Sequence, residues 1–215
     1  MGEPIYLGRI VAVGRNRDGK CAAMYRVSSR SFPNRRALLS DDGASIVPKE
    51  GHESDVFKSP YIAYTCAGIS GATAVVSNGS HTDPILEKID AGMPVRDAMA
   101  LTLLALDYEH DQLDTPRIAA AIEAGASTGW LGVVRKDGLH VRELAIAPGT
   151  CYYVSTYEHN EVRVEQSDGF VCESADACCD TILAEGRFAD FQNPVTAVAA
   201  FETDGGFVFA AHDMG

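Results

Sequence analysis

The sequence lacks any long apolar run. Although 46% of its 215 residues are hydrophobic, no stretch approaches the roughly 18 residues that a membrane-spanning helix needs. The chain starts Met1-Gly2-Glu3-Pro4, which has neither the basic region nor the apolar stretch of a secretory signal. We therefore expect a cytoplasmic protein without a membrane partner.

Basic residues are also scarce. The 18 Lys and Arg residues are outnumbered by 30 Asp and Glu residues, which gives a net charge of −12. Binding to a nucleic-acid backbone requires a broad surface of clustered Lys and Arg, so we expect no nucleic-acid partner. A small anion is still compatible with this charge if the few basic residues lie together.

The six cysteines include no Cys-x-x-C pair, and no histidine follows Cys178 and Cys179 at the spacing of a zinc finger. An even number of cysteines does not by itself indicate disulfides in a chain of this size. We therefore expect buried thiols, with no bound metal and no cofactor.

The arginines are concentrated in one segment. From Cys21 to Ser40 there is no Asp or Glu, and this window holds four of the thirteen arginines. Arginine binds phosphate through paired, charge-assisted hydrogen bonds, and short hydroxyl side chains can complete such a site. The candidate phosphate ligands are Arg26, Ser28, Ser29, Arg30 and Ser31. The alternative is a basic loop that pairs with surface carboxylates elsewhere.

The pattern of apolar residues predicts an α+β fold in one domain covering residues 1–215. Predicted strands cover residues 5–13, 22–28, 61–67, 72–77, 130–134, 139–144, 151–156, 162–165, 195–201 and 207–211, and predicted helices begin at residue 84 or cover residues 94–107, 115–124 and 175–185. Residues 31–58 are predicted to be mostly turns, and the helix over residues 98–106 is apolar on nearly every side, which predicts burial between layers. Strands in runs with grouped helices favour a four-layer α-β-β-α sandwich.

A second polar segment, residues 77–83 (SNGSHTD), leads into a predicted helix. The free N–H groups of a helix N-terminus favour anions and polarised carbonyls. Its candidate substrate-binding residues are Asn78, Ser80, His81 and Thr82. The alternative is that Thr82 or Asp83 only caps the helix, while Asn78-Gly79 turns the chain.

A third polar segment, Asp107-Tyr108-Glu109-His110-Asp111, follows the apolar helix. Carboxylates close to one another and to a helix C-terminus repel each other and face the negative end of the helix dipole, and both effects raise a carboxyl pKa. Glu109 is therefore a candidate proton carrier. The alternative is a hydrated acidic turn.

Four long motifs resemble the archaeal IMP cyclohydrolase family. They are YRVSSRSFPNR at residues 25–35, SPYIAY at 59–64, VVSNGSHTD at 75–83 and LDYEHDQLDTPRIAAAI at 106–122. The similarity extends over almost the whole chain, from Tyr6 to Met214. It implies a fold like that of N-terminal nucleophile hydrolases, used without their nucleophile, and a homo-oligomer such as a tetramer.

The resemblance also implies an activity, the cyclisation of 5-formamidoimidazole-4-carboxamide ribonucleotide (FAICAR) to IMP with release of water. This substrate supplies its own nucleophile, the carboxamide nitrogen, so the protein mainly has to hold a purine ribonucleotide and move protons. Carried over by motif, the catalytic residues are Tyr64, Glu109 and Arg35. Tyr61 and Tyr64, three positions apart in one predicted strand, should point to opposite faces, and the motif favours Tyr64.

Two other functions remain open from the sequence. One is an amidohydrolase acting on a purine precursor, and the other is a noncatalytic module that binds a purine monophosphate. The N-terminal nucleophile amidohydrolases need Ser, Thr or Cys at the mature N-terminus. This chain begins Met1-Gly2-Glu3 and has Cys21 inside a predicted strand, which disfavours the amidohydrolase.

Overall fold

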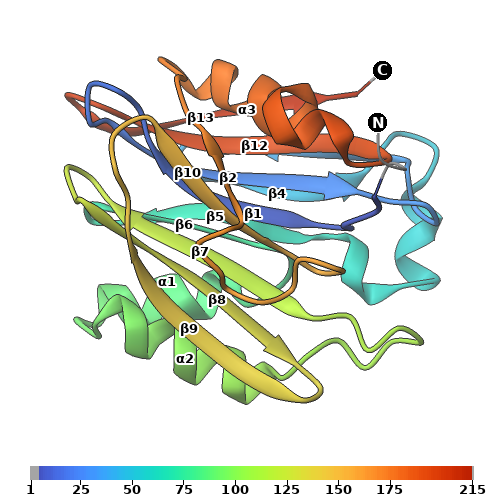
Figure 1. Cartoon of the computed structure of the whole chain (residues 1–215). Helices are drawn as coiled ribbons and strands as arrows, with labels where there is room; N and C mark the ends of the chain where they lie inside the picture. The colour runs from blue at the N-terminus through green and yellow to red at the C-terminus, as the bar shows by residue number, and fades with distance from the viewer. Residues whose placement is uncertain (1–4, 215) are drawn as a thin grey trace.

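The computed structural model describes residues 5–214 and contains two antiparallel β-sheets that face each other (Figure 1). The segment Met1-Gly2-Glu3-Pro4, on which the expectations about a secretory signal and an N-terminal nucleophile depend, lies outside the described residues. Among the described residues, no helix has the length and apolar character needed to cross a membrane.

The first sheet has six strands in the order β11-β10-β1-β2-β12-β13. The strands are β1 (Ile10–Arg15), β2 (Cys21–Ser28), β10 (Thr150–Ser155), β11 (Ser167–Gly169), β12 (Pro194–Thr203) and β13 (Gly206–Asp213). The predicted hairpin between the first two strands is present. Asn16 closes it, because its side-chain oxygen accepts hydrogen bonds from the backbone N–H groups of Asp18 and Lys20.

The second sheet has seven strands in sequence order, from β3 to β9. The strands are β3 (Arg35–Leu39), β4 (Gly43–Pro48), β5 (Tyr64–Ser70), β6 (Thr73–Ser77), β7 (Arg117–Glu123), β8 (Thr128–Arg135) and β9 (Gly138–Ala145). The core between the two sheets is rich in small side chains. They include Ala23, Ala67, Ala74, Ala120 and Ala200, which allow the sheets to pack closely.

Helices cover the outer faces of both sheets (Figure 1). Helix α3 (Ala175–Ala184) packs on β2, β12 and β13, whereas α1 (Thr82–Asp90) and α2 (Val95–Leu106) pack on the second sheet. Residues 5–214 also form three short 3-10 helices, η1 (Glu53–Phe57), η2 (Pro60–Ile62) and η3 (Gly186–Asp190). The class is therefore mixed α and β with antiparallel sheets. All six cysteines are buried free thiols.

Several predicted elements differ from the structure. The helix predicted over residues 115–124 is wrong, because Arg117–Glu123 is the strand β7, paired with β6 and β8. The segment predicted to be mostly turns contains the β3–β4 hairpin. The predicted strand at residues 162–165 is absent, and the short strand β11 follows it at Ser167–Gly169.

The sequence of helix α2 predicts that it is buried between layers. In the structure, α2 instead forms part of the outermost layer. It buries Ala98, Met99 and Leu103 against the second sheet. On its other side Leu101 and Leu104 are 48% and 65% exposed. The helix therefore has an apolar outer face.

Candidate active site

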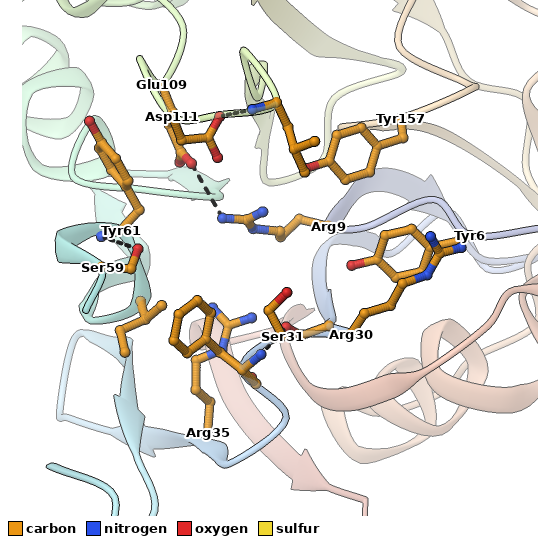
Figure 2. A pocket seen from close by; sticks show the side chains of 14 residues that line it. Tyr6, Arg9, Arg30, Ser31, Arg35, Ser59, Tyr61, Glu109, Asp111 and Tyr157 are labelled. Carbon is orange, nitrogen blue, oxygen red and sulfur yellow. Dashed lines mark hydrogen bonds and ion pairs between the residues drawn. The ribbon is translucent and has the colours of Figure 1, made fainter. Parts of the chain in front are cut away.

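A polar pocket lies where corresponding ends of strands from both sheets meet. Neighbouring antiparallel strands alternate in direction, so the beginnings of β1, β3, β5 and β7 lie at the same end of the molecule as the ends of β2 and β10. The residues that line the pocket come from the segments at these strand ends, namely Tyr6, Arg9, Ser29, Arg30, Ser31, Phe32, Arg35, Ser59, Tyr61, Ile62, Glu109, Asp111, Leu113 and Tyr157 (Figure 2). Segments far apart in the sequence thus form one site.

Glu109 is the carboxylate at the base of this pocket and is only 1% exposed. Arg9 Nη2 donates a hydrogen bond to its Oε2 at 3.4 Å, and Arg117 Nη1 lies 3.9 Å from its Oε1. Burial raises the pKa of Glu109, while the positive charges of Arg9 and Arg117 oppose the rise. A carboxyl with a raised pKa and partners that stabilise its ionised form can both accept and return a proton.

The physical cause of this raised pKa differs from the one predicted. Burial is the main cause, and the negative charge of Asp111 adds to the rise. Asp111 itself holds the loop in shape, since its side chain accepts hydrogen bonds from the backbone of Leu113 and from both the N–H and the hydroxyl of Thr115. The acidic segment is therefore an ordered loop that presents Glu109.

Arg35 lines the pocket opposite Glu109 (Figure 2) and is only 2% exposed. Its Nε donates a hydrogen bond to the carbonyl oxygen of Phe32 at 3.0 Å. Its Nη1, like Nε of Arg9 and Oε1 of Glu109, is buried without a hydrogen-bond partner among the described residues. Buried polar atoms without partners are rare in folded proteins and suit a site that a polar ligand completes.

Tyr61 and Tyr64 do not share a strand as predicted. Tyr61 belongs to η2 and lines the pocket, whereas Tyr64, which the motif favours, is the first residue of β5 and is not among the lining residues. The hydroxyl of Tyr64 lies 2.6 Å from that of Tyr25. Burial raises the pKa of Tyr64, and the positive charges of Arg35 and Arg9 oppose this rise, so the phenol lies beside the arginines that line the pocket.

The mouth of the pocket contains Arg30 with Ser29 and Ser31. The guanidinium carbon of Arg30 lies 3.9 Å above the centre of the Tyr6 ring. Tyr6 in turn stacks on Tyr157, with ring centres 5.8 Å apart. These contacts hold a cation at the entrance, beside two hydroxyl side chains.

Arg26 and Ser28 do not reach the pocket, contrary to the prediction from composition. Arg26 is fully buried on the side of β2 that faces α3. Its guanidinium donates hydrogen bonds to Ser28 Oγ and to the backbone carbonyl oxygens of Ile182, Leu183, Phe188, Phe191 and Gln192. All three guanidinium nitrogens are occupied, so Arg26 joins β2 to α3 and η3 and is unsuited to binding phosphate.

The segment 77–83 supplies no side chain to the pocket lining. Asn78 and His81 are buried and bond to the backbone at the beginning of β7, and the Thr82 hydroxyl bonds to Ser77 and Gly79. Ser80 is exposed. His81 occupies the N-cap position of α1 without a side-chain capping bond, so the simple capping alternative is also incorrect.

Comparison with known proteins agrees with the motifs. The sequence profile described as "IMP cyclohydrolase-like protein" matches residues 6–206. The chain is 44% identical to the IMP cyclohydrolase of Methanosphaera stadtmanae, over 93% of this chain and 96% of that protein. It is 44% identical to the one of Methanocella arvoryzae (97% and 98% covered) and 41% identical to the one of Methanocaldococcus jannaschii (94% and 96% covered).

The chain belongs to the IMP cyclohydrolase family.

Sequence reasoning missed two arginines of this IMP cyclohydrolase family member, Arg9 and Arg117. Arg9 directly precedes the buried strand β1 and its apolar run IVAV, and Arg117 is the first residue of β7, directly before the apolar run IAAAI. A lone charge at the head of such a run is the signal that could have indicated them. Their distance from Glu109 in space depends on how the strands are arranged, which the sequence alone does not show.

Proposed function

We propose that this protein is an IMP cyclohydrolase that converts FAICAR into IMP and water, without a metal or cofactor. The observation that carries the proposal is the buried Glu109 carboxylate facing arginines at the base of a pocket with a cationic mouth. Membership of the family, with relatives named IMP cyclohydrolase over nearly their full length, supports the same activity.

The pocket suits a ribonucleotide bound with its phosphate at the mouth. Arg30, with the hydroxyls of Ser29 and Ser31, offers charge-assisted and neutral hydrogen bonds to phosphate. The imidazole ring of the substrate, with its formamide and carboxamide groups, then extends inward to Glu109, Arg9 and Arg35. Holding the formamide and carboxamide groups against each other supplies much of the rate enhancement, because both reacting groups belong to one ligand.

The reaction needs two proton transfers. The carboxamide nitrogen attacks the formyl carbon, forming the new ring bond, and loses one proton. The formamide nitrogen loses the second proton as the formyl oxygen departs. Both protons end on that oxygen, which leaves as water. In our proposal ionised Glu109 accepts the first proton and returns it, Arg35 stabilises the developing negative charge on oxygen, and Tyr64 orients the reacting groups or donates a proton.

The properties of Cys21 also disfavour the amidohydrolase alternative. Cys21 is buried, its Sγ lies 3.4 Å from the carbonyl oxygen of Ala126, and burial raises its pKa to about 11. A thiol with a raised pKa is a poor nucleophile near neutral pH.

We also propose that the two facing sheets with outer helices form a four-layer sandwich like that of N-terminal nucleophile hydrolases. The protein would work in the cytoplasm as a homo-oligomer, with a tetramer as our specific expectation. The exposed leucines of α2 support self-association. Light scattering of the purified protein tests this, and a monomer at micromolar concentration would contradict it.

The decisive experiment is incubation of the purified protein with FAICAR, without added metal or cofactor, while IMP formation is followed by ultraviolet absorbance. We expect IMP from the wild type and a loss of at least about 100-fold in kcat for Glu109→Gln. Glu123→Gln, on the exposed far end of β7, is the matched control and should keep full activity. Release of the free amine would indicate the amidohydrolase, and binding of IMP without turnover would indicate the binding module.

A further inference from the structure

The segment 77–82 lies next to Arg117, which in turn lies next to the pocket residues Tyr61 and Glu109. This arginine is the first residue of β7 and only 7% exposed. Alternate residues of a strand point to the same face, so the Arg117 side chain lies on the same face of β7 as Ala119 and Ala121, which pack toward α1 and α2. Its side chain therefore lies on the helix-facing side of the second sheet, next to the beginning of α1.

The backbone on both sides of Arg117 is fixed by this segment. The Asn78 side chain donates a hydrogen bond to the carbonyl oxygen of Pro116 at 3.0 Å and accepts one from the N–H of Ile118 at 2.7 Å. His81 Nε2 lies 2.9 Å from the carbonyl oxygen of Ile118. Since that oxygen only accepts, Nε2 carries the proton and Nδ1 does not.

Gly79 provides the space for the guanidinium group. A Cβ atom at this position would lie 2.7 Å from Arg117 Nη1 and 3.2 Å from His81 Nδ1. Burial lowers the pKa of His81 to about 3, so the imidazole beside Arg117 is neutral near pH 7. The segment thus contributes a gap and an uncharged ring, and it adds no positive charge that would repel Arg117.

On its other side, Arg117 lies next to two residues that line the pocket, Tyr61 and Glu109. Its guanidinium carbon lies 5.8 Å from the centre of the Tyr61 ring, and its Nη1 lies 3.9 Å from Glu109 Oε1. Arg9 approaches the other carboxylate oxygen, Oε2. The two arginines therefore flank Glu109, one from each sheet.

We propose that Arg117 is a positioning residue for the cyclisation, held by the segment 77–82 so that it fixes the Oε1 side of the Glu109 carboxylate. This inference rests on the proposed role of Glu109. The SNGSHTD motif, which contributes no side chain to the pocket lining, would thus act by holding Arg117 in place.

The charges that face Glu109 determine the expected effect of removing Arg117. They are Arg9, Arg117 and Arg35, which favour the carboxylate, and Asp111, which disfavours it. Loss of one nearby opposite charge, with burial unchanged, raises a carboxyl pKa by roughly 1–3 units. Because ionised Glu109 begins the reaction, the acidic limb of the pH–rate profile should move to higher pH by the same amount.

The test uses Arg117→Met, Arg117→Lys and Gly79→Ala in the full chain. Arg142→Met and Gly138→Ala are matched controls, since Arg142 is exposed on β9 and a Cβ at Gly138 meets no atom within 4 Å. The first readout is the pH titration of the Glu109 side-chain carbon by NMR of ¹³C-glutamate-labelled protein, assigned by the loss of its signal in Glu109→Gln. The second readout is the pH dependence of kcat for IMP formation.

We expect Arg117→Met to raise both the NMR pKa of Glu109 and the acidic limb by roughly 1–3 units. Gly79→Ala should give a smaller shift in the same direction, Arg117→Lys should restore most of the wild-type profile, and the controls should change nothing. If Arg117→Met does not fold, Gly79→Ala and Arg117→Lys decide the matter by the same readouts.

An unchanged NMR pKa of Glu109 in folded Arg117→Met, or in Gly79→Ala if the former does not fold, would overturn the inference. Failure of the proposed function looks different. In that case Glu109→Gln would retain the wild-type rate, or no IMP would form at all, while the NMR titration would still report whether Arg117 acts on Glu109.

Discussion

Replacing Arg26 with Met tests whether this arginine is a structural brace, as its contacts indicate, or a phosphate ligand, as composition suggests. Four backbone carbonyl oxygens lie within 3.1 Å of its guanidinium nitrogens, those of Ile182, Leu183, Phe188 and Phe191. The Phe188 oxygen would still accept a hydrogen bond from the N–H of Phe191. The other three acceptors would lose their donor at a cost of about 2 kcal/mol each, or about 6 kcal/mol together.

Part of this loss is offset. Burial lowers the pKa of Arg26 to about 10, and this reduction corresponds to about 3 kcal/mol for holding the charge away from water. We therefore expect Arg26→Met to lower the free energy of unfolding by about 3 kcal/mol, which is at the upper end of what most single substitutions cost.

Urea unfolding followed by circular dichroism measures this change. Arg30→Met is the matched control, because Arg30 is exposed at the mouth of the pocket. It should change the free energy of unfolding by less than about 0.5 kcal/mol. If Arg26→Met unfolded at the same urea concentration as the wild type and instead lost affinity for the nucleotide, the structural account of Arg26 would be wrong.

Three further outcomes are expected. Arg30→Met should raise the KM for FAICAR by about tenfold or more with little change in kcat, as expected for lost phosphate binding, and an unchanged KM would remove that role. Tyr64→Phe loses the hydroxyl that contacts Tyr25, which should lower the free energy of unfolding by about 1–3 kcal/mol. In the folded variant kcat should fall by at least about tenfold, whereas full turnover would contradict the role of Tyr64. The pKa of His81 is lowered by burial to about 3, so its stabilising contribution is complete above pH 6.5 and is lost as the pH falls toward 3. Between pH 7 and 5 the free energy of unfolding should fall by up to about 2 kcal/mol from this group, and His81→Gln should flatten the dependence. An equally steep dependence in that variant would show that other groups cause it.

Strands and helices with clear patterns could be predicted from the sequence, whereas β7 could not. Its sequence RIAAAI is rich in alanine, which has a high helix propensity, and the preceding Thr-Pro resembles a helix start. Pairing with β6 and β8 outweighs both local signals. The β3–β4 hairpin was missed for a related reason, since turn residues surround short strands of which β3 is largely exposed.

The candidate site was predicted in part. Glu109, Arg30, Arg35, Ser29 and Ser31 do line one pocket, because their motifs lie in segments that meet at strand ends. Composition could not show which face of β2 carries Arg26. Its side chain lies on the same face as Ala22 and Met24, which pack against α3, whereas Tyr25 points to the other sheet.

The small side chains between the sheets affect the candidate site, because they determine how far apart the two sheets lie. Arg9 and Arg30 belong to segments of the first sheet, whereas Arg35, Glu109 and Arg117 belong to segments of the second. The residues of the candidate site are thus divided between the two sheets, and alanines such as Ala23 and Ala120 lie in the core between these sheets. A larger residue at one of these alanines would move the sheets apart and misalign the reacting groups without altering any residue that meets the nucleotide.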